Sequence, residues 1–302
     1  MEWVTVNEVG PRDGLQNQPV LVDTEGKIRL IQAIIDAGIR SIEATSFASA
    51  RAVPQMADAA ALFAALPAKD RIDYSALVPN IKGYERAREA GATSIAVVLS
   101  ASDTMNRKNI NMSLAEARSA CGKVIRRAAA DGVTGRGYIA VASCCPYEGP
   151  TPAPRVLDLA DEMFAAGAAE VIIADTIGAA NPTGVFKLLT ALGTRHAMNR
   201  LSAHFHDTRA MALANVWAAL HAGVRKFDSC LGGLGGCPFA PGASGNLATE
   251  DLVFMLSECG YDTGVSVDAL RRAAKVAEQL VRRPLGGRIA PWLESRDGRT
   301  PT

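Results

Sequence analysis

The order of predicted strands and helices restricts the possible folds of this 302-residue chain more than any other feature. Eight short apolar runs predict strands, at residues 4–9, 41–45, 72–78, 94–99, 137–142, 170–175, 201–206 and 226–230. Alanine-rich segments with apolar residues at i, i+3 and i+4 predict helices at 25–37, 56–66, 83–90, 114–130, 156–166, 185–192 and 209–222. This regular alternation favours a parallel sheet covered by helices.

Eight strand–helix units predict an α/β fold of the (β/α)8 TIM-barrel type. A doubly wound open sheet is the alternative, but such a sheet usually carries Gly-x-Gly-x-x-Gly after its first strand. Here the first strand runs into Gly-Pro-Arg-Asp-Gly at 10–14. We expect a single catalytic domain over residues 1–302, with the barrel over about 3–260 and a C-terminal helical extension. That extension holds an amphipathic helix at 267–282 and a polar tail, 283–302, that we expect to be loosely ordered.

The composition excludes several classes of function. Thirty-two basic and 31 acidic side chains leave a net charge of +1, and no long basic run occurs, so we expect no nucleic-acid partner. No window of 18 consecutive apolar residues occurs, so we expect no membrane span. The six cysteines form no Cys-x-x-Cys pair, and the first strand begins at once, which predicts reduced thiols and a cytoplasmic location.

A glycine-rich segment at 231–251, here called the glycine loop, follows the eighth predicted strand and leads into a predicted helix at 247–258. It carries six glycines and two prolines, so its backbone can adopt positive φ and approach a ligand closely. Long loops after barrel strands are where catalytic groups lie. Cys237 in this loop is either a buried small hydrophobic residue or, above a cationic site, a proton donor or acceptor.

Two of the four histidines, His204 and His206, lie on one predicted strand. Because residues i and i+2 of a strand share a face, both imidazoles are expected to point into the barrel mouth, where they would suit a divalent metal. The alternative is that one of them is a hydrogen-bonded core histidine. Asp13 and Asn246 are candidate oxygen ligands. Such a set fits Mg²⁺ or Mn²⁺ with open coordination positions better than a closed structural zinc site.

Arg12 lies at the end of the first predicted strand, beside Asp13. Neighbours of this kind usually form a surface ion pair. At the end of a buried strand, however, the guanidinium would supply a fixed cation for a developing oxyanion. Polar residues also stand at the ends of the other predicted strands, and in a barrel these ends converge on one mouth.

Several of these segments together resemble the 3-hydroxy-3-methylglutaryl-CoA (HMG-CoA) lyase family. The segments are 8–17, 42–47, 146–149, 175–178, 204–208 and 232–251. The resemblance runs from about residue 3 to residue 280, and Gly-Gly-Cys-Pro-Phe-Ala-Pro-Gly-Ala-Ser-Gly-Asn in the glycine loop is its most specific part. It implies a metal-dependent (β/α)8 enzyme that cleaves a 3-hydroxy-3-substituted glutaryl-CoA into acetyl-CoA and a 3-oxo acid.

The resemblance also implies roles for individual residues. It implies that the metal ligands are Asp13, His204, His206 and Asn246. It implies that Arg12 stabilises the enolate of acetyl-CoA and that Cys237 transfers a proton. Further acidic residues associated with the site match Glu43, Asp175 and Glu250, and substrate contacts are expected from Arg12, Gln16, Asn109 and Thr176. A homodimer is expected as well.

Two stretches depart from the familiar pattern. Arg-Ala-Met at 209–211 stands where many members have Tyr-Gly-Gln, and the loop at 102–112 differs while keeping Asn109 and Asn111. The second departure would bear on contacts with the substrate or with CoA. The substituent at C3 of the substrate is either a methyl group or a larger alkyl chain, and the resemblance does not decide between them.

Two other functions remain as alternatives. A condensing acyltransferase of the isopropylmalate or homocitrate synthase type shares the Arg-Asp and His-x-His features, but we would expect a different cysteine loop and a regulatory domain. A non-catalytic barrel would usually lack some of the ligands, and here each expected one is present.

Overall fold

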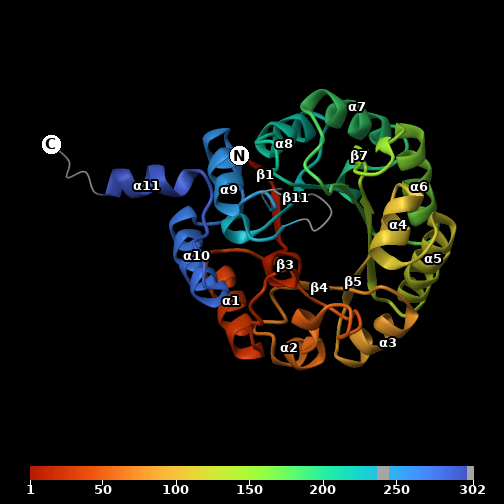
Figure 1. The fold of residues 1–302 in the computed structure, drawn as a ribbon. Coiled ribbons are helices and arrows are strands. Elements are labelled where there is room, and N and C mark those ends of the chain that lie inside the picture. Colours follow the sequence, from red (N-terminus) through yellow and green to blue (C-terminus); the bar gives the residue numbers. More distant parts are fainter. Residues whose placement is uncertain (237–244, 298–302) are drawn as a thin grey trace.

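The computed structural model describes residues 1–236 and 245–297, and its centre is a closed barrel of parallel strands (Figure 1). The order around the barrel is β10-β11-β2-β3-β4-β5-β6-β9. These strands are β2 (Thr5–Glu8), β3 (Ser41–Ser46), β4 (Asp73–Leu77), β5 (Ser94–Ser100), β6 (Thr134–Ala140), β9 (Glu170–Asp175), β10 (Leu201–Phe205) and β11 (Lys226–Ser229). The predicted (β/α)8 barrel is thereby confirmed, and the open sheet is wrong.

Helices surround the barrel as an outer ring (Figure 1). They are α1 (Thr24–Asp36), α2 (Ala59–Ala65), α3 (Ile81–Glu89), α5 (Leu114–Ala130), α6 (Ala153–Ala165), α7 (Pro182–Gly193), α8 (Ala212–His221) and α9 (Thr249–Glu258). Several begin at a side chain that accepts a backbone N–H of the first turn, as Asp23 does from Gly26 and Asn181 does from Gly184. No described helix has both the length and the apolar character needed to cross a membrane.

The interior of the barrel carries polar side chains as well as apolar ones. Tyr138 on β6 contacts Glu43 on β3 and Asp228 on β11, and these strands are not neighbours in the barrel. The large apolar core therefore lies between the strands and the helices, where α1, for example, buries Leu30 and Ile34. Polar side chains inside the barrel can therefore contribute to a binding site at the strand ends.

Several short elements were absent from the sequence-based expectation. The loop after β5 forms a further helix, α4 (Asp103–Ile110), and the loop after β6 forms a small antiparallel pair, β7 (Cys144–Cys145) with β8 (Gly149–Pro150). At the N-terminus, β1 (Glu2–Trp3) pairs with β12 (Tyr261–Asp262), which follows α9. Short helical turns add η1 (Gly10–Gly14), η2 (Pro54–Met56), η3 (Met198–Arg200) and η4 (Leu231–Gly233).

The C-terminal extension begins with α10 (Val267–Val281), as expected. The expectation of a loosely ordered tail is wrong for the segment 285–297. Residues 285–289, here called the C-terminal strap, bind α9 through their backbone, because Gly287 N donates to Glu250 and Arg288 N and Ile289 N donate to Asp251. The strap leads into α11 (Ile289–Asp297), which extends away from the barrel (Figure 1).

Candidate metal centre and active site

Three potential metal ligands converge at the carboxyl ends of β2 and β10, the two strands that flank β11 in the barrel. Asp13 lies in η1 directly after β2, His204 lies in β10, and His206 follows that strand. One ligand atom from each lies within 4.8 Å of the others. The two imidazoles share a face of β10, as their i, i+2 spacing predicts.

Asn246 reaches the same place from the end of the glycine loop. Its Nδ2 donates to Asp13 Oδ2 at 2.8 Å and to the carbonyl of Leu234 at 3.1 Å. Its Oδ1 is buried and has no hydrogen-bond partner within residues 1–236 and 245–297, and the same holds for His206 Nδ1. Leaving buried polar atoms unpaired is costly, so these ligand atoms beside a carboxylate fit a bound divalent cation. The residues present therefore suit the metal that the sequence predicts.

The end of the glycine loop is held between two barrel strands. Leu247 N donates to the carbonyl of Phe205 at 3.1 Å, and Cys230 N donates to the carbonyl of Leu247 at 2.9 Å. Gly235 approaches Asn246 closely at φ +136°, and a Cβ at Gly235 would lie 2.6 Å from Asn246 Nδ2. Only glycine fits this position without displacing the amide.

Arg12 is buried between two carboxylates and does not form the surface pair that such neighbours usually make. Its guanidinium donates to Asp13 Oδ1 at 2.5 Å and to Glu43 Oε2 at 2.7 Å. The Arg12 side chain is only 8% exposed, and the proximity of Glu43 and Asp13 outweighs burial and raises the pKa of Arg12 further. The side chain is thus a fixed cation beside the candidate metal site.

The electrostatics of the site favour the metal-binding forms of Asp13 and His206, whereas Asp228 and Asp13 outweigh burial and raise the pKa of His204. Burial alone would raise the pKa of Asp13, but Arg12 and His204 lower it to about 2, so the carboxylate is ionised at neutral pH. Burial, together with the nearby His204, lowers the pKa of His206 to about 4, which leaves a neutral imidazole that can bind a metal. Burial raises the pKa of Glu43, although Arg12 opposes this.

Three other predicted site residues lie at the centre or at the end of β9. Gln16 lies at the centre, where its Nε2 donates to Asp13 Oδ1 at 2.8 Å. Thr176 and Asp175 organise the end of β9, since Thr176 Oγ1 accepts from Val141 N and the Asp175 carboxylate accepts from Ala179 N and Ala180 N. Burial raises the pKa of Asp175.

Of the remaining predicted residues, Glu250 binds backbone groups, Asn109 is exposed, and Cys237 lies outside the described residues. Both carboxylate oxygens of Glu250 accept backbone N–H groups, one from Gly232 and one from Gly287. Asn109 is exposed in the last turn of α4. Cys237 belongs to the segment 237–244, which the structure does not describe.

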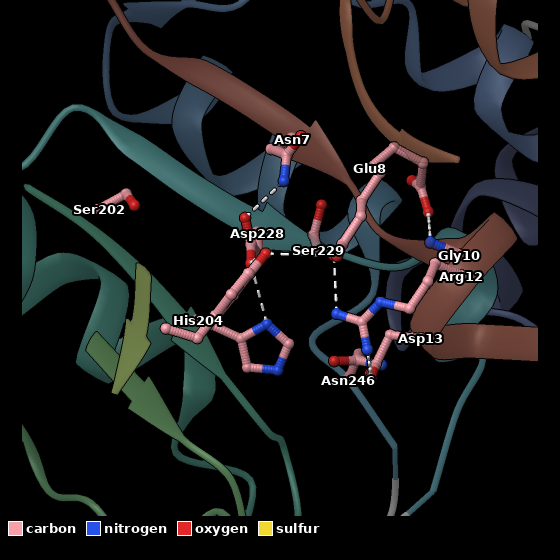
Figure 2. A network of polar contacts seen from close by, with 12 residues as sticks. Asn7, Glu8, Gly10, Arg12, Asp13, Ser202, His204, Asp228, Ser229 and Asn246 are labelled. Carbon is pink, nitrogen blue, oxygen red and sulfur yellow. Dashed lines mark hydrogen bonds and ion pairs between the residues drawn. The ribbon is translucent and has the colours of Figure 1, made fainter. Parts of the chain in front are cut away.

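Sequence reasoning missed Asp228 and Tyr138. Asp228 lies between Asn7 and His204, as Figure 2 shows. It accepts hydrogen bonds from Asn7 Nδ2 and the Tyr138 hydroxyl, and His204 Nδ1 lies 3.2 Å from its Oδ2. A signal was present in the sequence, because Asp228 is an acidic residue inside a strand-like run, and a buried carboxylate requires partners.

Known proteins resemble this chain over nearly its whole length. A family model described as HMGL-like matches residues 3–277. The hydroxymethylglutaryl-CoA lyase of Bacillus subtilis is 44% identical over 285 residues, which cover 94% of this chain and 95% of that protein. The mitochondrial hydroxymethylglutaryl-CoA lyase of Bos taurus is 41% identical over 287 residues, which cover 95% and 88%.

Solved structures agree with these matches. The crystal structure of HMG-CoA lyase from Bacillus subtilis superposes with a TM-score of 0.94 at 43% identity, and the alignment covers 97% of this chain and 99% of that one. An HMG-CoA lyase from Acinetobacter baumannii, in complex with coenzyme A and 3-methylmalate, gives a TM-score of 0.91 at 38% identity and covers 99% and 96%. The barrel, the converging ligands and these matches together show that the chain is an enzyme of the HMGL-like family and belongs to its HMG-CoA lyases.

Proposed function

We propose that this protein cleaves HMG-CoA into acetyl-CoA and acetoacetate, with a divalent metal held by Asp13, His204, His206 and Asn246. The observation that carries the proposal is the group of ligand atoms from Asp13, His204 and His206 within 4.8 Å, directly beside the buried Arg12. Relatives named hydroxymethylglutaryl-CoA lyase at 41–44% identity support the substrate. The relative with coenzyme A and 3-methylmalate supports an acyl-CoA partner.

The reaction breaks the bond between C2 and C3 of the substrate. The 3-hydroxyl loses its proton and becomes the ketone of acetoacetate, while the electron pair of the broken bond moves onto the thioester carbonyl as an enolate. That enolate then gains a proton at carbon and becomes acetyl-CoA. A divalent metal at this site would lower the pKa of the substrate hydroxyl and align the substrate oxygens.

The residues of the chain meet the remaining demands. Arg12 presents a fixed guanidinium to the charge that develops on the thioester oxygen, and it needs no reorganisation because Asp13 and Glu43 already hold it. Glu43 keeps its Oε1 buried and unpartnered within the described residues, and burial raises its pKa, so it can accept a proton. Cys237 is proposed as the group that protonates the enolate carbon.

We propose Mg²⁺ or Mn²⁺ as the metal. Two imidazole nitrogens, one carboxylate and one amide oxygen would hold such a cation and would leave it able to bind substrate oxygens as well. A homodimer and a cytoplasmic location also stay predictions.

The test uses protein stripped of metal and resupplied with Mg²⁺, Mn²⁺ or Zn²⁺. HMG-CoA and analogues with larger C3 alkyl groups are offered, and acetyl-CoA and the 3-oxo acid are quantified by chromatography. We expect turnover of HMG-CoA that chelator abolishes and Mg²⁺ or Mn²⁺ restores. Preference for a longer C3 chain would reassign the substrate. Release of free CoA from acetyl-CoA and a 2-oxo acid, without lyase products, would indicate the condensing alternative instead.

A further inference from the structure

Four buried polar residues lie side by side on four adjacent strands of the barrel. In the strand registers, His204 on β10 pairs with Asp228 on β11, Asp228 pairs with Asn7 on β2, and Asn7 pairs with Ser41 on β3. All four are buried, with exposed fractions between 2% and 7%. Because paired residues of parallel strands stand at one level, their side chains form one layer inside the barrel.

Hydrogen bonds link the residues of this layer and converge on the Asp228 carboxylate. The Ser41 hydroxyl donates to Asn7 Oδ1 at 2.8 Å, which fixes the orientation of the Asn7 amide. Asn7 Nδ2 then donates to Asp228 Oδ1 at 2.7 Å. The other oxygen of Asp228 accepts from the Tyr138 hydroxyl at 2.8 Å and lies 3.2 Å from His204 Nδ1. Figure 2 shows the links from Asn7 to Asp228 and from Asp228 to His204.

This arrangement determines which nitrogen of His204 carries the proton. An ionised carboxylate only accepts hydrogen bonds, so the contact with Asp228 requires a proton on His204 Nδ1. The lone pair then lies on Nε2, the nitrogen that remains available to bind a metal together with Asp13 and His206. A metal-binding histidine generally donates its second ring nitrogen to such a partner, which sets its tautomer and its orientation.

We propose that Asp228 is a positioning residue for the metal site, and that Asn7 and Ser41 hold Asp228 in turn. The proposal deepens the proposed function and rests on it, because it assigns the orientation of one of the proposed metal ligands. Asp228 acts through His204 and contacts no substrate in this scheme. The Tyr138 hydroxyl on β6 donates a hydrogen bond to the same carboxylate from across the barrel.

The Asp228→Asn substitution tests this with little change of volume. The introduced amide can keep its oxygen toward Asn7 Nδ2, but its Nδ2 then faces the Tyr138 hydroxyl and His204 Nδ1. The Tyr138 hydroxyl can donate to Glu43 instead and accept from the amide, whereas His204 Nδ1 can accept only after it gives up its proton. We expect His204 to shift to the other tautomer and metal affinity to fall by about 10–100-fold, the usual effect of losing such a partner.

Two further variants complete the experiment. Ser41→Ala frees the Asn7 amide to rotate and should weaken Mn²⁺ binding by about fivefold, the equivalent of one hydrogen bond. Ser202→Ala is the matched control, because Ser202 is also a buried serine on a barrel strand but donates to Glu170, outside this layer. It should leave the affinity unchanged.

Mn²⁺ affinity is measured by calorimetry on metal-free protein, and the His204 tautomer is read from ¹⁵N chemical shifts of the same metal-free protein. Circular dichroism reports whether each variant folds; if Asp228→Asn does not fold, Ser41→Ala decides. Wild-type affinity and an unchanged tautomer in the folded variants would overturn the proposal. A different result would separate the two proposals. If the wild type binds no Mn²⁺ but shows the Nδ1-protonated tautomer, and Asp228→Asn abolishes that tautomer, the metal site of the proposed function is wrong. The positioning of His204 by Asp228 is then still supported.

Discussion

Glu8 at the end of β2 should make the stability of the protein depend on pH. Its side chain is fully buried and accepts three hydrogen bonds, from Gly10 N at 2.8 Å, Leu231 N at 2.9 Å and Thr249 Oγ1 at 2.6 Å. Burial is the largest influence and raises the pKa of Glu8 to about 7, despite these hydrogen bonds. The residue joins the turn that holds Arg12 to both ends of the glycine loop.

The expected magnitude follows from the difference between this pKa and the ordinary value of 4.5. It corresponds to about 3 kcal/mol of folding free energy. Because the folded state holds the proton more tightly than the unfolded state, this stabilisation is fully present below pH 4.5. It is lost as the pH rises through 7, where the buried carboxyl ionises.

The Glu8→Gln variant isolates this contribution. The glutamine oxygen can still accept from Gly10 and Leu231, and its amide can donate to Thr249 Oγ1, which can turn its own hydrogen toward Ser229. Unfolding in urea is followed at pH values from 4.5 to 8.5 for the wild type, the variant and Glu25→Gln, an exposed control on α1. The wild type should lose about 3 kcal/mol more than Glu8→Gln as the pH rises. Parallel pH curves for the two proteins would refute the reasoning.

Three further substitutions have defined outcomes. Arg12→Lys should lower kcat on the order of 10²–10³-fold, because a point charge cannot replace the forked guanidinium; normal kcat with a raised KM would place Arg12 in substrate binding instead. Cys237→Ser should lower kcat sharply without changing metal affinity or unfolding, and substrate should shield Cys237 from alkylation in peptide maps; near-normal kcat would exclude proton transfer. Gly287→Ala places a Cβ 2.2 Å from Asp251 Oδ1, so the C-terminal strap should detach in part. The free energy of unfolding should then fall by about 1–3 kcal/mol, while metal affinity stays unchanged. Equal stability of variant and wild type would mean that the strap contributes nothing to stability.

The barrel was predictable because periodicity is a local property of the sequence. The helix predicted at 114–130 coincides with α5, since its apolar spacing is regular and Ser113 with Glu116 forms a capping box at its start. Prediction failed where polar residues lie inside regular structure. β6 begins at Thr134 and not at 137, because Arg136 is buried against Asp73 and Glu170, which no apolar pattern reveals. The same holds for α4, which is mostly polar.

The candidate metal ligands were predictable for a similar reason. The His204 and His206 pair is visible in five letters of sequence, and a barrel brings every strand end to one mouth, so Asp13 could be joined to them without knowing any distance. Glu250 illustrates the limit of this reasoning. The resemblance associates Glu250 with the site, and its partners in the structure are the backbone N–H groups of Gly232 and Gly287, 18 and 37 residues away. A backbone donor leaves no mark in a sequence.

For Asp228, the sequence predicts the direction of the side chain but not its hydrogen-bond partners. The alternation of a strand indicates which of its residues face inward, so Asn7, Asp228 and His204 could each have been assigned to the barrel interior. Their hydrogen bonds, however, require that three strands share one register, and a shift of one residue along any strand would turn these side chains outward. Register is set by the closure of the whole barrel. The orientation of His204 is therefore a property of the complete fold, although the residue itself is evident from a short motif.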